Sequence, residues 1–111
     1  MVVMVVMVAA DPVIEKVRSA LAGAYGRRLE RIVLYGSRAR GDANSDSDYD
    51  IAVFVEELTG RWQEFLRLAD IELAILEETG AIVHAMPYPA RSWTDPSSPL
   101  MHEIRTDGID L

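Results

Sequence analysis

No cysteine occurs among the 111 residues, so disulfide bonds and thiolate metal sites are excluded. This composition suits a reducing compartment, and we predict a cytoplasmic protein. Lysine is almost absent, since Lys16 is the only one and arginine supplies the other positive charges. Long hydrophobic runs are absent as well. The apolar residues 1–10 fall short of the roughly 20 that a membrane span needs, and they lack the basic residues of a signal peptide.

The charge of the chain is strongly acidic, with a formal net charge of −7. Non-specific binding of long nucleic acid depends on positive side chains that neutralise phosphates, so we expect no such partner for this acidic chain. We expect no membrane partner either. The basic residues nevertheless gather in one short segment, namely Arg27, Arg28, Arg31, Arg38 and Arg40. A local basic cluster on an acidic body favours a small anionic ligand.

The length predicts one small domain, which we place at residues 11–111. Residues 1–10 consist only of methionine, valine and alanine. We interpret them as an apolar N-terminal extension, with Met4 or Met7 as a candidate start of the protein. A flexible tail or an added β-strand is the alternative.

The spacing of apolar residues predicts helices and strands in alternation along the chain. Asp11-Pro12 is typical of a helix start, and Gly80 of a helix end. We predict helices at 12–25, 60–79 and 100–106, strands at 31–35, 50–55 and 81–86, a polar loop at 36–47, and a short tail at 109–111. Two prolines, Pro87 and Pro89, are expected to end the third strand.

The predicted helix 60–79 carries two apolar lines, one of Trp62, Phe65, Leu66, Ala69, Leu73 and Leu76, and a second of Leu68, Ile71 and Ile75. Either both lines face the core, as a broad apolar stripe usually does, or the second line meets a partner or a second copy. In the last helix, Leu100, Met101 and Ile104 are expected to point inward and His102 outward. Tyr88 and Trp93 either cover an edge of the core or contact a partner.

Two clusters of functional residues lie in the segment between Leu34 and Phe54. Asp48 and Asp50 are two residues apart at a strand start, so both carboxylates point to the same face. Such a pair suits Mg²⁺, whose coordination is completed by water and substrate phosphates. Gly36 permits close approach of a ligand to the backbone, and Ser37 offers an N–H and a hydroxyl to a phosphate. Arg38 and Arg40 can bind phosphate oxygens.

Three other interpretations compete for this segment. The spacing of Gly36 and Gly41 matches a Walker-type phosphate loop, but Asp42-Ala43 stands where Lys-Ser/Thr is needed, so that motif is excluded. The spacing of Asp46, Asp48, Asp50 and Glu57 matches a calcium loop. However, Ile51 replaces its required glycine. An acidic turn without function is the third interpretation.

Gly36-Ser37, ten intervening residues and Asp48-x-Asp50 between two strands resemble the signature of the DNA polymerase β-like nucleotidyltransferases. The form Gly-Ser-Arg-Ala-Arg-Gly-Asp resembles the minimal nucleotidyltransferase (MNT) domains. The resemblance implies an α/β (α+β) fold with a short mixed sheet and packed helices. It also implies Mg²⁺, ATP as substrate, and transfer of a nucleotide to a hydroxyl with release of pyrophosphate. Asp48 and Asp50 would bind the metal, and Gly36 and Ser37 the phosphates.

MNT domains often pair with helical HEPN toxins, so the resemblance implies an antitoxin that adds AMP to its toxin and forms a hetero- or homo-oligomer. Active relatives usually carry a third carboxylate on a following strand. The corresponding segment, Ile82 to Met86, has no acid, and His84 is its only polar residue. Either His84 serves as base or ligand, or the domain neutralises its partner by binding alone. Asp70 and Glu72 are expected to be solvated on their helix.

Overall fold

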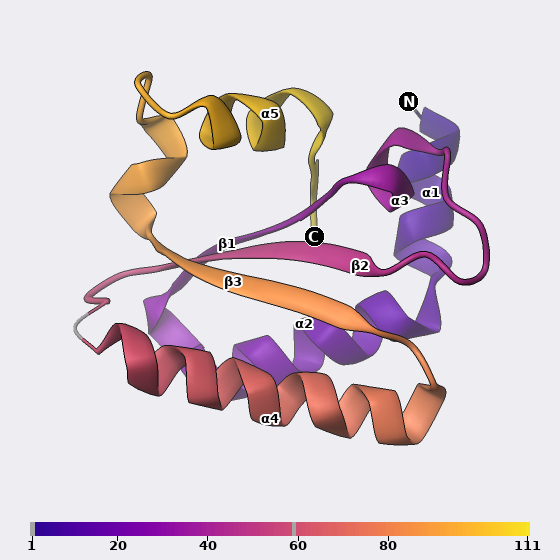
Figure 1. Ribbon diagram of the computed structural model, residues 1–111, viewed down its shortest axis with the longest axis horizontal. Coiled ribbons are helices and arrows are strands. Elements are labelled where there is room, and N and C mark those ends of the chain that lie inside the picture. The colour runs from indigo at the N-terminus through magenta and orange to yellow at the C-terminus, as the bar shows by residue number, and fades with distance from the viewer. Residues whose placement is uncertain (1, 59) are drawn as a thin grey trace.

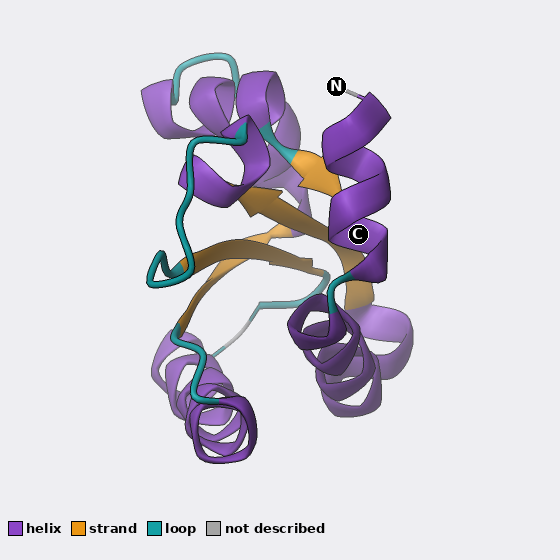
Figure 2. Ribbon diagram, turned by 90° about the vertical axis from the view of Figure 1, so that its right-hand side faces the viewer, coloured by secondary structure: helices purple, strands orange, loops and turns teal. Residues whose placement is uncertain are grey.

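The computed structural model describes residues 2–58 and 60–111. A four-stranded sheet in the order β3-β2-β1-β4 forms the middle layer. Helices α2 and α4 lie side by side against one face of this sheet, and α5 lies over part of the other face (Figures 1 and 2). The expected mixed α/β architecture is therefore confirmed. No helix within the described residues is long and apolar enough to cross a membrane.

The elements follow one another in the order α1 (Val2–Ala10), α2 (Pro12–Tyr25), the 3-10 turn η1 (Gly26–Arg28), β1 (Leu29–Tyr35), α3 (Ser37–Arg40), β2 (Tyr49–Val55), α4 (Arg61–Thr79), β3 (Val83–Pro89), the 3-10 turn η2 (Ala90–Thr94), α5 (Pro99–Asp107) and β4 (Ile109–Asp110). The three predicted helices and three predicted strands are all present. Asp11 caps α2 as expected, its side chain accepting a hydrogen bond from the Val13 N–H.

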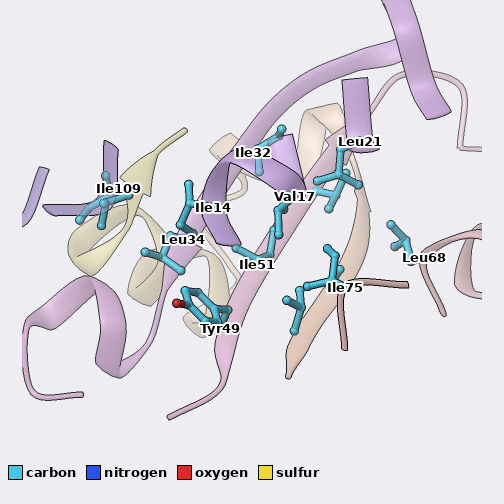
Figure 3. Packing of buried hydrophobic residues seen from close by; sticks show 14 of the residues in the cluster. Ile14, Val17, Leu21, Ile32, Leu34, Tyr49, Ile51, Leu68, Ile75 and Ile109 are labelled. Carbon is cyan, nitrogen blue, oxygen red and sulfur yellow. The ribbon is translucent and has the colours of Figure 1, made fainter. Parts of the chain in front are cut away.

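Strand β2 is central and pairs antiparallel with β1 and parallel with β3. Its alternate residues point to opposite faces of the sheet. Ile51, Val53 and Val55 belong to the core beneath α2 and α4, where Val17 and Leu68 are also buried (Figure 3). Residues 51–55 of β2 are all buried because the strand is covered on both faces, and Ala52 and Phe54 enter a second, smaller core with α5.

The smaller core accounts for the two aromatic residues whose role the sequence left open. The Tyr88 ring stacks on Phe54 with centroids 5.6 Å apart, and the Trp93 ring meets Phe54 edge-on at 5.4 Å. Both rings therefore cover the edge of the core. Met101 and Ile104 of α5 are buried beside them, whereas Leu100 is 39% exposed, so its expected inward position is wrong.

Residues 2–10 form helix α1, so neither a flexible tail nor an added strand describes them. Val8 is buried in the larger core, and Met4 packs against it. The sulfur of Met4 also lies beside Gly41, at the end of α3. An apolar run with no polar residue carries no period from which its helical form could be predicted, and contact with the rest of the fold decides it.

The interpretation that both apolar lines of α4 face the core is confirmed for the second line and wrong for the first. The second line faces the core, with Leu68 fully buried and Ile75 3% exposed. The first line faces outward, where Trp62 is 72% exposed and Leu73 53% exposed. The second line thus cannot meet a partner, and the outward apolar face is the one that sequence reasoning assigned to the core.

Two expectations about the sheet edges also need correction. Pro87 and Pro89 lie within β3 rather than after it. The Tyr49 N–H donates to the Ile82 carbonyl, so the even-numbered residues of β3 make the backbone hydrogen bonds to β2. The backbone nitrogens of residues 83, 85, 87 and 89 therefore point away from β2. Proline is therefore tolerated there, on an edge strand. Residues 109–111 are not a simple tail, because Ile109 and Asp110 pair with β1.

Candidate functional site

The two aspartates of the motif lie where the loop after α3 joins β2. Asp50 is in β2, opposite Tyr35 of β1 and His84 of β3. Asp48 immediately precedes the strand, and both carboxylates are half-buried. Their two-residue spacing directs them to the face that α5 only partly covers. The shared face predicted for the pair is thus compatible with the observed strand.

Gly36 brings the other half of the motif against Asp50. Its φ is 75° and its ψ −157°, a conformation that residues with a side chain rarely adopt. A Cβ added to Gly36 would lie 2.4 Å from Oδ2 of Asp50. The ten residues between Ser37 and Asp48 therefore fold back, so that the backbone at the Gly-Ser pair and the second aspartate are in direct contact.

Ser37 begins α3, a single helical turn. The N–H groups of Ala39 and Arg40 both donate to the Gly36 carbonyl, each at 3.1 Å. Gly41 ends the turn in a left-handed conformation, with φ at 87°. The turn thus begins at Ser37, directly after the glycine that contacts Asp50, and the Ser37 N–H and hydroxyl are the groups expected to meet an anionic ligand.

The two arginines of the motif have different surroundings. Arg38 is half-buried, and its Nε donates to the Ser47 carbonyl at 2.9 Å. Its guanidinium also lies 3.9 Å from the centroid of the Tyr49 ring. Arg40 is exposed and pairs with Asp42 at 3.3 Å. Arg38 therefore holds the loop in its folded-back form, and Arg40 is the more accessible cation.

His84 lies beside the first aspartate. Its Nε2 is 2.9 Å from Oδ2 of Asp48, and both side chains remain partly open to solvent. This contact orients the Asp48 carboxylate. His84 thus occupies the position on β3 that faces the aspartate pair, as its alignment with Asp50 in the sheet requires.

The surroundings of Asp50 disfavour its charged form. Burial raises the pKa of Asp50 above its ordinary value, and the neighbouring Asp48 carboxylate adds to the rise. The imidazole of His84 and the guanidinium of Arg40 act in the opposite direction without cancelling it. A divalent cation between the two carboxylates would relieve this repulsion.

The donor set agrees with magnesium bound together with a phosphate ligand. Within residues 2–58 and 60–111, no group of three or more histidine, cysteine or acidic side chains could enclose a metal. Two carboxylates on one face are what Mg²⁺ uses when substrate phosphates and water supply the other oxygens. Asp48 and Asp50 would hold the ion, beside the backbone of Gly36 that contacts Asp50.

Two further residues near the site were missed or misplaced by sequence reasoning. Glu72 is half-buried rather than solvated, whereas Asp70 is exposed as expected. Burial raises the pKa of Glu72, while a hydrogen bond from the Ala85 N–H and the nearby His84 oppose the rise. Asp11 accepts a hydrogen bond from the Tyr49 hydroxyl at 2.7 Å, in addition to capping α2. Contacts of this kind depend on the tertiary fold and leave no sequence pattern.

Comparison with known proteins identifies the family of this chain. The family model described as a nucleotidyltransferase domain matches residues 14–102. Among curated relatives, "Putative protein adenylyltransferase MJ0604" of Methanocaldococcus jannaschii is 29% identical over 76 residues, which cover 68% of this chain and 70% of the relative. From the same organism, "Putative protein adenylyltransferase MJ0141" is 45% identical over 31 residues, which cover 28% of this chain and only 31% of that relative.

Solved structures show the same fold. A toxin–antitoxin structure with AMP-PNP has a TM-score of 0.57 at 20% identity, covering 86% of this chain and 69% of the other. A structure described as a minimal nucleotidyltransferase has a TM-score of 0.55 at 28% identity, covering 87% of this chain and 94% of the other. With the Gly-Ser pair against Asp50 and a family model matched over most of the chain, this protein belongs to the nucleotidyltransferase domain family.

Proposed function

We propose that this chain, with Mg²⁺, transfers AMP from ATP to a hydroxyl group of a protein partner and so serves as the antitoxin of a HEPN-type helical toxin. The observation that carries the proposal is the contact between Gly36 and Asp50, which joins a phosphate cradle to a carboxylate pair. The names of the two curated relatives and the toxin–antitoxin context of the structural neighbour support the same reaction and partner class.

In this proposal each half of the motif has a distinct task. The backbone at Gly36 and Ser37 would bind phosphate oxygens of the triphosphate, and Asp48 and Asp50 would hold the metal. Bound Mg²⁺ would offset the negative charge that builds up on the leaving pyrophosphate. His84 keeps the Asp48 carboxylate in position through their 2.9 Å contact. Because Arg38 is occupied by the Ser47 carbonyl, the exposed Arg40 is the better candidate for an additional phosphate contact.

The transfer step is a displacement at the α-phosphorus of ATP. An oxygen of the acceptor hydroxyl forms the new bond to phosphorus, and the bond to the oxygen bridging the α- and β-phosphates breaks. Pyrophosphate leaves, and the hydroxyl proton passes to a base. His84 is the nitrogen base beside the aspartate pair and the candidate for that role, in place of the third carboxylate of active relatives.

The experiment is label transfer from ATP labelled at the α-phosphate. The acceptor tested is a purified HEPN-type helical toxin, with Mg²⁺ present and then removed by chelation. We expect transfer by the wild type and a loss of at least about 100-fold in Asp48→Asn with Asp50→Asn, because the metal site is lost. Asp46→Asn is the matched control, since Asp46 is an exposed carboxylate of the same loop. Transfer that persists in the double variant contradicts the proposed role of the pair.

A second candidate function is supported by the absence of an acid facing the aspartates from β3, within the described strand Val83–Pro89. Such a domain could neutralise its toxin by forming a complex, with slow transfer or none. The same double variant separates the two functions: a binding antitoxin still protects cells that express the toxin, whereas a transferring antitoxin loses protection. Folding of the variant is checked by circular dichroism.

A further inference from the structure

Helix α1 lies against the short turn that carries the Gly-Ser half of the motif (Figure 1). We call residues 36–41, which are α3 and its two flanking glycines, the motif turn. A Cβ added to Gly41 would have atoms of Met4 as its three nearest neighbours, with the sulfur at 3.1 Å. The family model begins at residue 14, so this contact comes from a helix outside the matched segment.

One side of α1 faces the rest of the fold. Met4 is half-buried and Val8 is buried, and Asp11 follows at the spacing of the same helical face. Val3 and Val6, on the other side, are exposed. Val8 attaches the C-terminal half of the helix to the larger core. Met4 therefore carries the contact between the N-terminal half of α1 and the motif turn.

A second link joins the end of α1 to the same turn. Asp11, directly after α1, accepts a hydrogen bond from the Tyr49 hydroxyl at 2.7 Å. The guanidinium of Arg38 lies 3.9 Å from the centroid of the Tyr49 ring. A cavity of about 250 Å³ is lined by residues of both links, among them Met4, Gly41, Asp11 and Arg38. On this side the motif turn is therefore held at two points with a cavity between them, and not by continuous packing.

Helix α1 is weak by itself. Five of its nine residues are valine, which has a low helix propensity, and nine residues are fewer than an isolated helix needs in water. Within the described helix, Val2–Ala10, the first turn has no acidic residue and the last turn no basic one to complement the helix dipole. Its helical form thus depends on docking, and the loss of one docking contact shifts α1 towards an undocked state.

We propose that Met4 is a positioning residue of the nucleotide site and acts through the motif turn. This inference rests on the function proposed above, in which the backbone at Gly36 and Ser37 binds phosphate oxygens. The N–H groups of residues 39–42 close the turn by donating to the Gly36 and Ser37 carbonyls. When α1 undocks, these bonds loosen, and the turn loses the conformation that places Gly36 against Asp50.

The first test is hydrogen exchange of the full chain, without ligand, at the amides of residues 39–42. Met4→Asp places a charge against the motif turn and is expected to speed this exchange at least about 10-fold. Met4→Leu keeps an apolar contact of similar volume and should stay within about 3-fold of the wild type. Val3→Asp is the matched control, because it puts the same charge on the exposed side of α1.

Two outcomes of the exchange experiment overturn the proposal. The first is an equal rate at residues 39–42 in Met4→Asp and the wild type. The second is an equally large rise at residues 51–55 of β2, because Met4 would then stabilise the whole fold and not the motif turn.

The second test is calorimetric titration of the same variants with ATP and Mg²⁺, in the absence of any acceptor. Met4→Asp is expected to weaken binding at least about 10-fold, because binding must then also order the turn. Met4→Leu and Val3→Asp should bind like the wild type. Faster exchange in the motif turn with unchanged ATP affinity overturns the positioning role. A wild type that binds no ATP contradicts the proposed function instead, and the exchange rates still decide whether Met4 holds the turn.

Discussion

The carboxylate of Asp50 touches the backbone of Gly36 so closely that no side chain could be placed between them: a Cβ on Gly36 would lie 2.4 Å from Oδ2. The contact joins the end of β1 to the start of β2 and fixes how the motif loop folds back. It also means that the identity of residue 36 controls the position of a proposed metal ligand. The site is therefore sensitive to a single methyl group.

Gly36→Ala is predicted to impair both stability and transfer. Alanine in this backbone conformation, which is accessible almost only to glycine, costs about 1–3 kcal/mol, and the clash with Asp50 adds to this cost. Displacement of Asp50 should lower the affinity for Mg²⁺ with nucleotide by at least about 10-fold, as loss of ligand positioning does. Urea unfolding and titration calorimetry measure the two effects.

The control for Gly36→Ala is Gly23→Ala, because Gly23 lies within α2 and an added Cβ there meets nothing within 4 Å. In a helix this change removes backbone freedom from the unfolded chain and stabilises by about 0.5–1 kcal/mol. Equal stability and equal nucleotide binding in the Gly36 and Gly23 variants would refute the importance of the contact.

His84→Ala is predicted to weaken Mg²⁺ binding about 10-fold, because Asp48 loses the group that orients it. His84→Asn, which keeps a hydrogen-bond donor, should recover part of the affinity. If His84 is also the base, His84→Asn should bind metal and nucleotide but transfer AMP much more slowly. His102→Ala, on the exposed side of α5, is the control. Unchanged metal affinity in His84→Ala would remove its positioning role.

The sequence predicted those parts of the fold that short-range patterns determine. Asp11-Pro12 marks a helix start because the side chain and the ring act on neighbouring backbone atoms. The two-residue spacing of Asp48 and Asp50 implies a shared face for the same reason. No local rule predicts the contact between Gly36 and Asp50, because the two residues are fourteen positions apart. Only the family signature indicated that the Gly-Ser pair and the aspartates belong to one site.

The remaining features depend on tertiary contacts within the fold, which no local sequence pattern predicts. Both apolar lines of α4 have helical spacing, and only the position of the sheet decides that Leu68 is buried and Leu73 exposed. Two residues of β4 are too few to show a period, so their pairing with β1 was not predictable. The half-buried Glu72 likewise depends on how α4 lies beside β3.

The Tyr49–Asp11 hydrogen bond predicts how stability responds to alkaline pH. Burial raises the pKa of Tyr49 from 10.0 to about 12, and the bond to Asp11 adds to the rise. Below pH 10 the phenol is protonated in both the folded and the unfolded chain, so its contribution is complete. Between pH 10 and 12 the unfolded chain loses the proton first, and folding stability falls.

Tyr49→Phe removes this titration as well as the hydrogen bond, which costs about 1 kcal/mol at neutral pH. The wild type should therefore be more stable at pH 8, and its advantage should shrink as the pH approaches 12. Burial also raises the pKa of Tyr35 to about 12. Both proteins therefore still lose some folding stability at alkaline pH. Urea unfolding at pH 8, 10 and 11.5 measures the difference, and a constant gap would contradict the assignment.

Each apolar face of α4 carries a leucine, and the sequence pattern alone does not show which of the two is buried. Leu68 is fully buried and Leu73 is 53% exposed. Leu68→Ala should lower the free energy of unfolding by about 2–5 kcal/mol, because it leaves a cavity beneath the sheet. Leu73→Ala should change it by less than about 0.5 kcal/mol, as surface substitutions do. Urea unfolding of both variants measures the difference. Equal effects of the two substitutions would show that α4 is rotated relative to the sheet.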